Sequence, residues 1–159
     1  MQKFIENLEE AERINRSVDH LVYVAFQLFK DKKILLKVLE EIKKSITKTI
    51  SAILQYDFIY KKIKLSENQK TNFDTFIQKC APRYSITPEE INKINEIFDA
   101  ILKHRESAME FTRREKIVIL SPDMQQKSIS LEQIKDFLQI SKTIAKKARN
   151  HMMIISESQ

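Results

Sequence analysis

Apolar side chains recur every three or four residues along most of this chain, which is the repeat of an amphipathic helix. One such pattern covers residues 3–30, and a second runs from residue 34 to about residue 64. Only the polar KDKK (30–33) separates them, and long helices with a short connection usually pack antiparallel. On a wheel with ~100° per residue, the first pattern predicts a buried arc of Phe4, Leu8, Ala11, Ile14, Val18, Leu21, Val22, Ala25, Leu28 and Phe29.

Three further helices are predicted from capping boxes, in which Ser or Thr is followed three residues later by Glu or Gln. Ser66 with Gln69 predicts a helix that ends near Cys80, because Pro82 disfavours helix just before it. The other boxes pair Thr87 with Glu90, where Pro88 takes the first helical position, and Ser130 with Gln133.

The segment between the last two predicted helices has the composition of strands. KIVIL (116–120) and KSISL (127–131) flank the turn-like SPDMQQ, so 116–131 is a candidate small β-hairpin. We therefore expect a mainly all-α protein, an antiparallel bundle of about five helices with two long N-terminal helices. Residues 1–150 form one domain in this interpretation, and residues 151–159 form a C-terminal tail.

The amino-acid composition excludes several classes of function. The chain has no glycine, which excludes the glycine-rich phosphate loops of P-loop and Rossmann proteins. Cys80 is the single cysteine, so a cysteine-based zinc cluster is excluded, and we expect no metal, no cofactor and a reducing, cytoplasmic setting. No apolar run approaches the ~18 residues of a membrane span. The net charge of +6 permits an acidic partner such as RNA.

RINRSVDH, near the start of the chain, concentrates candidate chemistry. Arg13, Arg16, His20 and Tyr23 line one stripe of the predicted helix, opposite the apolar arc. Such a stripe is suited to hold a phosphate, with His20 moving protons near neutral pH, which makes Arg13, Arg16 and His20 candidate catalytic residues.

A solvated face is the alternative interpretation of this stripe. Glu9 stands four residues before Arg13, and Glu12 stands four residues before Arg16, the favourable order for helical ion pairs. That arrangement would account for the arginines without a ligand.

Three polar residues stand at the edge of the core in this helix: Asn15, Asp19 and Tyr23. Asn15 and Asp19 lie nearest the apolar arc, where a polar side chain either meets a partner or specifies packing. The solvated-face interpretation explains these two positions least well.

A second basic group follows the fourth predicted helix. Its members, candidates for nucleic-acid or anion binding, are Arg105, Arg113, Arg114 and Lys116. Arginine suits bidentate contact with phosphate, although a basic connecting loop has the same composition. KKAR (146–149) with Lys142 makes the last helix basic as well.

The Arg-x6-His spacing from Arg13 to His20, in a bundle of four or five helices, resembles the HEPN superfamily. In that family the motif normally lies in a later helix, and Arg149–Asn150–His151 has only the Arg-Asn start of it. The resemblance implies an RNase or an inactive relative of one, often a dimer.

Three functions follow as hypotheses. The first is a non-enzymatic module that binds RNA or another acidic partner, working as a homodimer. The second is a metal-independent RNase of the HEPN type that uses Arg13 or Arg16 with His20. The third is a protein-interaction scaffold, which predicts a large exposed apolar patch.

Overall fold

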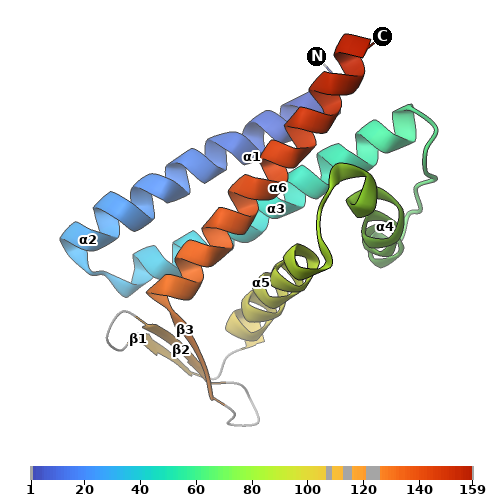
Figure 1. Cartoon of the computed structure of the whole chain (residues 1–159). Coiled ribbons are helices and arrows are strands. Elements are labelled where there is room, and N and C mark those ends of the chain that lie inside the picture. The colour runs from blue at the N-terminus through green and yellow to red at the C-terminus, as the bar shows by residue number, and fades with distance from the viewer. Residues whose placement is uncertain (1, 107–108, 113–115, 121–125, 159) are drawn as a thin grey trace.

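The computed structural model describes residues 2–106, 109–112, 116–120 and 126–158 of the chain. Its long helices are α1 (Lys3–His20), α3 (Lys32–Ile59), α5 (Pro88–Glu106) and α6 (Leu131–Ser158) (Figure 1). The short elements are α2 (Phe26–Phe29), α4 (Gln69–Thr75), the π-helical turns η1 (Leu21–Ala25) and η2 (Phe76–Cys80), the 3-10 turn η3 (Ala81–Tyr84), and strands β1 (Met109–Thr112), β2 (Lys116–Leu120) and β3 (Gln126–Ser130). The predicted mainly all-α bundle is confirmed.

The two N-terminal helical segments form the predicted antiparallel pair. Lys30 ends α2 in the left-handed conformation with φ 52°, and Asp31 caps α3 by accepting a hydrogen bond from the Lys33 N–H. The chain therefore reverses direction within two residues, and α3 runs back along α1. α6 packs against both of these helices (Figure 1).

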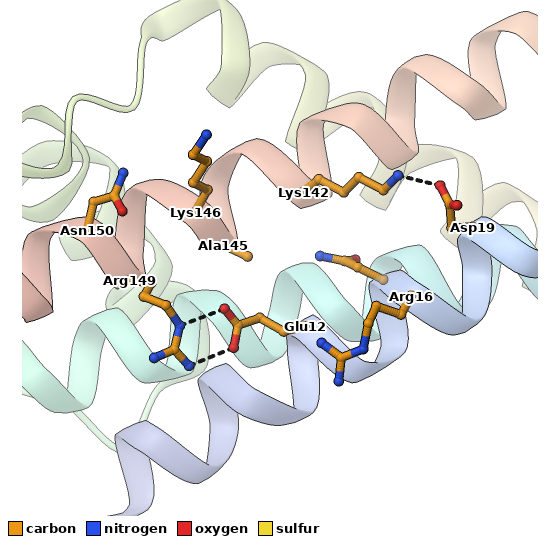
Figure 2. Close-up of a pocket in the computed structure, with 9 residues that line it drawn as sticks. Glu12, Arg16, Asp19, Lys142, Ala145, Lys146, Arg149 and Asn150 are labelled. Carbon is orange, nitrogen blue, oxygen red and sulfur yellow. Dashed lines mark hydrogen bonds and ion pairs between the residues drawn. The ribbon is translucent and has the colours of Figure 1, made fainter.

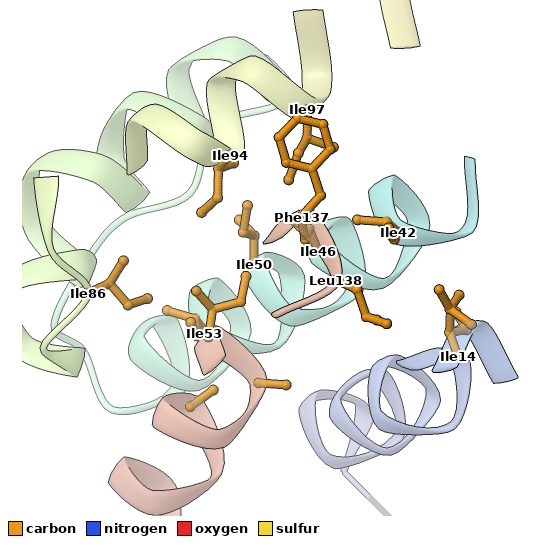
Figure 3. Close-up of a cluster of buried hydrophobic side chains, with 14 of the residues drawn as sticks. Ile14, Ile42, Ile46, Ile50, Ile53, Ile86, Ile94, Ile97, Phe137 and Leu138 are labelled. Atoms are coloured by element: carbon orange, nitrogen blue, oxygen red, sulfur yellow. The ribbon is translucent and has the colours of Figure 1, made fainter. Parts of the chain in front are cut away.

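α3 runs through the middle of the bundle and carries its core. Figure 3 shows where buried side chains of α1, α3, α5 and α6 meet: Ile14, Ile42, Ile46, Ile50, Ile53, Ile94, Ile97, Phe137 and Leu138. Full burial of a side chain of this size stabilises the fold by about 1.5–3 kcal/mol. Because the same helix contacts three others, the positions of α1, α5 and α6 are all set against α3.

The π-helical turn η1 changes the face that the end of the first helix buries. A π-turn holds more residues than an α-turn, and the buried side chains here step by four, from Val18 to Val22 to Phe26. Leu28 and Phe29 are 72% and 71% exposed, so this part of the predicted buried arc is wrong. The wider turn rotates the positions after it away from the core.

Two of the three predicted capping boxes are present. Thr87 Oγ1 accepts a hydrogen bond from the Glu90 N–H at 3.1 Å, and Glu90 Oε1 accepts one from the Thr87 N–H at 2.9 Å. Ser130 and Gln133 make the same pair of contacts at the start of α6, at 3.1 and 2.9 Å.

The third predicted box is replaced by a different cap. Asn68 caps α4 by accepting hydrogen bonds from the N–H groups of Lys70 and Thr71. Ser66 instead accepts a hydrogen bond from the Asn68 N–H, and so supports the cap from outside the helix. The prediction of Ser66 as the cap is wrong because a shorter-range asparagine contact takes its place.

A small antiparallel sheet precedes α6, with the strand order β1-β2-β3. β2 pairs with β3 in a register that sets Ile117 opposite Ile129, on the segment that the sequence marked as a candidate hairpin. β1 lies on the other edge of β2 and had no counterpart in the sequence prediction. Ile129 is buried and joins the sheet to the helical core.

α6 continues past residue 150, where the sequence predicted the start of a tail. Met152 is buried, and the His151 ring stacks on the Tyr84 ring with 4.0 Å between their centroids. These contacts explain why the helix does not end there.

A buried ionic cluster ties the end of α3 to η3. Asp57 is 1% exposed, and its carboxylate accepts hydrogen bonds from Arg83 Nη2 at 2.7 Å and from the Tyr84 hydroxyl at 3.0 Å. Burial and the neighbouring Asp57 carboxylate raise the pKa of the Tyr84 hydroxyl. The tyrosine therefore stays a donor to the carboxylate.

We expect Arg83→Met to lower the free energy of unfolding by about 2 kcal/mol, because it leaves a buried carboxylate without its counter-ion. The Arg83 side chain is 34% exposed, so the loss should be smaller than for a fully buried pair. Urea denaturation measures it. Arg13→Met is the matched control, since Arg13 pairs with Glu10 on the exposed surface. Equal stability of both variants would contradict the role of the Asp57 cluster.

Candidate anion-binding slot

A hollow lies between α1 and α6, with a volume of about 410 Å³. We call it the α1–α6 slot; it is lined by Glu12, Asn15, Arg16, Asp19, Lys142, Ala145, Lys146, Arg149 and Asn150 (Figure 2). The two helices run antiparallel here, because Glu12 meets Arg149 while Asp19 meets Lys142. Ala145 stands between these two contacts, and its methyl group is too small to fill the space.

Each end of the slot is crossed by an ion pair. Arg149 donates to both carboxylate oxygens of Glu12, at 2.6 and 2.7 Å, and Lys142 binds Asp19 (Figure 2). The hydrogen bonds from Arg149 to Glu12 raise the pKa of Arg149 above its usual value. Glu12 and Asp19 are seven positions apart, so the bridges stand about 10 Å apart along α1.

Asn15 lies at the floor of the slot and is only 5% exposed. Its Oδ1 accepts hydrogen bonds from the hydroxyls of Ser141 at 2.6 Å and Ser45 at 2.7 Å, both fully buried. Distances this short are typical of O–H···O bonds and not of N–H···O bonds, which assigns the amide oxygen to the hydroxyl side. Within the described residues, Asn15 Nδ2 has no hydrogen-bond acceptor, so two N–H groups remain for a ligand.

Arg16 and Lys146 line opposite walls of the slot and are both exposed. Neither makes an ion pair or side-chain hydrogen bond within the described part of the chain, and in Figure 2 Lys146 extends away from α1. The lining has four cationic side chains and two carboxylates, and hence a surplus of two positive charges. Those charges sit on long side chains that can turn toward a bound anion.

Of the residues in the predicted N-terminal stripe, Arg16 lines the slot, and Arg13, His20 and Tyr23 do not. Arg13 is exposed and binds Glu10 at 2.6 Å, a contact that lowers the pKa of Glu10. His20 is exposed and does not line the slot, while Tyr23 lies under the Lys135 ammonium, 5.2 Å from the ring centroid. Within one chain, Arg13, Arg16 and His20 are therefore not gathered in one cavity of the described structure.

The glutamate partners predicted for the solvated face are wrong. Arg13 pairs with Glu10 and not with Glu9, and Glu12 turns to Arg149 on another helix. The bidentate contact to a partly buried guanidinium is stronger than an exposed pair along one helix. Because Glu12 binds Arg149, Arg16 makes no ion pair with any described residue.

The second basic group is only partly within the described structure. Arg113 and Arg114 lie outside the described residues. Arg105 falls in α5 and Lys116 in β2, but their side chains lie outside the described part as well.

Cys80 lies in the core. It is fully buried, and burial together with the Asp57 carboxylate raises the pKa of its thiol to about 12. A thiol held protonated in this way is a poor nucleophile.

Two negative findings concern only the described residues. Their His, Cys, Asp and Glu side chains form no group of three or more that could hold a metal ion. None of their helices combines the length and the apolar run needed to cross a membrane.

Comparisons of the chain with protein-family models, with curated proteins and with solved structures find no match.

Several residues that line the slot are named in the sequence analysis, but their arrangement is not predicted there. Asn15, Arg16 and Asp19 were candidates in the first helix, and Lys142 and Lys146 belonged to the basic last helix. The missed feature is that α1 and α6 face each other with matching spacing. That signal is present in the sequence: positions 12, 15, 16 and 19 repeat the steps of positions 142, 145, 146 and 149.

The burial of the His151 imidazole leads us to expect that the stability of the fold depends on pH. Burial lowers its pKa below the usual 6.5, so the folded state favours neutral imidazole. The stabilisation is complete above the unfolded-state pKa and is lost as the pH falls through the lower folded-state pKa.

We expect the melting temperature to fall between pH 7.5 and pH 5, and His151→Phe to reduce that slope. Calorimetry at several pH values measures it. His20→Gln, at an exposed position, should keep the wild-type slope. The same slope in His151→Phe as in the wild type would show that another group titrates.

Proposed function

We propose that this protein is a non-enzymatic module that binds RNA through the α1–α6 slot. The observation that carries the proposal is the Asn15 amide nitrogen at the floor of the slot, which has no hydrogen-bond acceptor among the described residues. It lies between walls that bear Arg16 and Lys146, and neither of these makes an ion pair with a described residue. Phosphate oxygens accept hydrogen bonds from amide, guanidinium and ammonium groups alike. The net charge of +6 favours the approach of any polyanion.

Arg16→Ala and Lys146→Ala should each weaken binding of a single-stranded RNA oligonucleotide. Each should also reduce the salt dependence of the affinity, by about 0.7 in the slope of log K against log salt for one lost phosphate contact. Fluorescence anisotropy at several salt concentrations measures both quantities.

Arg13→Ala is the matched control, because it removes the same charge from the same helix, one turn away and outside the slot. It should bind RNA like the wild type. If all three variants lose affinity equally, the binding is a general effect of charge. Absence of binding at low salt in the wild type would refute the proposal.

An RNase of the HEPN type is the second candidate. His20 and Arg16 are four residues apart on α1, both are exposed, and neither has a partner among the described residues. Denaturing gels of the same binding reactions test this function: cleavage that His20→Ala abolishes would favour it, and intact RNA would favour the binding module.

We also propose a homodimer, in a reducing, cytoplasmic setting. Four large apolar side chains gather on η1 and α2 with exposures of 44–72%: Tyr23, Val24, Leu28 and Phe29. Such patches are typical of interaction surfaces. This patch also supports the scaffold alternative, in which a different protein covers it.

The double variant with Leu28→Ser and Phe29→Ser should sediment as a monomer where the wild type sediments as a dimer, because it removes the two most exposed apolar side chains of the patch. Leu102→Ser is the control, since Leu102 is 54% exposed on α5, outside the patch. A monomeric wild type would refute the homodimer.

A further inference from the structure

We infer that the α1–α6 slot binds a terminal phosphate group, a phosphomonoester, and not the internal phosphodiesters of a polynucleotide that runs along it. This inference rests on the proposed function and specifies which part of the RNA enters the slot. Three features of the slot support it: the ion pairs that cross its ends, its charge and its volume.

The two ion pairs lie across the path that a polymer would follow along the slot. Glu12–Arg149 and Asp19–Lys142 each join α1 to α6, about 10 Å apart along α1 (Figure 2). A strand that continued past either end would have to displace a bridge between the helices and place its phosphates beside Glu12 or Asp19. A ligand that terminates inside the slot avoids both costs.

The donors between the bridges match a phosphomonoester in number and in charge. A phosphomonoester carries a charge of about −1.5 to −2 near neutral pH and three terminal oxygens that accept hydrogen bonds. The slot offers a surplus of two positive charges and three donor groups, on Arg16, Lys146 and the Asn15 amide, that have no acceptor among the described residues. An internal phosphodiester has one charge and two terminal oxygens, and would leave part of this donor set unused.

The volume of the slot is that of a site for a small group. About 410 Å³ falls in the lower part of the range for small-molecule sites, roughly 300–1,000 Å³. A phosphate with its sugar fits a site of this size. The chemistry is the same whether the phosphate ends an RNA strand or belongs to a free mononucleotide, and the experiment separates the two sources.

The test compares two forms of one single-stranded RNA oligonucleotide, labelled with fluorescein at the 3′ end. One form carries a 5′-phosphate and the other a 5′-hydroxyl. We expect the wild-type protein to bind the 5′-phosphate form about tenfold more tightly, which equals about 1.4 kcal/mol. In Arg16→Ala and Lys146→Ala the ratio of the two affinities should fall to near one, while Arg13→Ala should keep the wild-type ratio.

Asn15→Asp tests the contribution of the Asn15 amide separately from the charges of Arg16 and Lys146, because it replaces the amide donor by a carboxylate oxygen. The 5′-phosphate preference should be lost, and circular dichroism and thermal melting identify a variant that does not fold. Asn15→Ser is the second variant: it removes the amide N–H groups without adding charge, and the preference should fall.

Adenosine monophosphate and adenosine, each added as a competitor, identify the source of the phosphate. Displacement of the 5′-phosphate RNA by the monophosphate alone supports a site for any terminal phosphate, and displacement by neither supports recognition of the RNA end. Equal displacement by both would overturn the inference. So would equal affinity of the wild type for the two RNA forms; if Arg16→Ala then weakens both forms, the proposed RNA binding stands without the terminal preference.

Discussion

The contact of one buried carbonyl oxygen with two buried hydroxyls joins the three helices that form the slot and its base. Asn15 Oδ1 on α1 accepts from Ser45 on α3 and from Ser141 on α6, and all three side chains are withdrawn from solvent. A buried polar group must find partners, so any sliding or rotation of one helix breaks these contacts and leaves unsatisfied atoms. The apolar side chains around them are less selective, because they tolerate small shifts. The Asn15 side chain therefore has two parts: its oxygen binds the two hydroxyls that align the helices, and its nitrogen remains to donate to a ligand in the slot.

The ion pairs at the ends of the slot follow from this alignment. The Asn15–Ser141 contact fixes α1 against α6, and along the same two helices Glu12 reaches Arg149 while Asp19 reaches Lys142. Both pairs are partly exposed, so their contribution to stability is modest. Their effect on the surface is larger, since they neutralise the carboxylates that would otherwise repel an anion. Functional and structural contacts therefore share one interface between α1 and α6.

Periodicity alone predicted the helices well, because burial of one face is the main energetic requirement of each. The exceptions have local causes. The π-turn η1 exposes Leu28 and Phe29, although simple α-helical periodicity places them on the buried arc. β1 escaped prediction because MEFT (109–112) alternates apolar and polar residues over only four positions, which is a weak strand pattern. Which helices face each other depends on contacts between distant residues, such as Ser141 with Asn15, and a helical wheel contains no information about these.

The pairing of each arginine matters more for a binding site than the total charge of the chain. Arg13 and Arg16 lie one turn apart on α1, are both exposed, and are equivalent in any count of charge. Arg13 pairs with Glu10. Arg16 has no ion-pair partner among the described residues, because the glutamate one turn before it binds Arg149 instead. An anion that binds Arg16 gains the attraction of its positive charge without displacing a carboxylate, and it meets the amide of the mostly buried Asn15. The difference between the two arginines is created by α6, which is why the site exists only in the folded bundle.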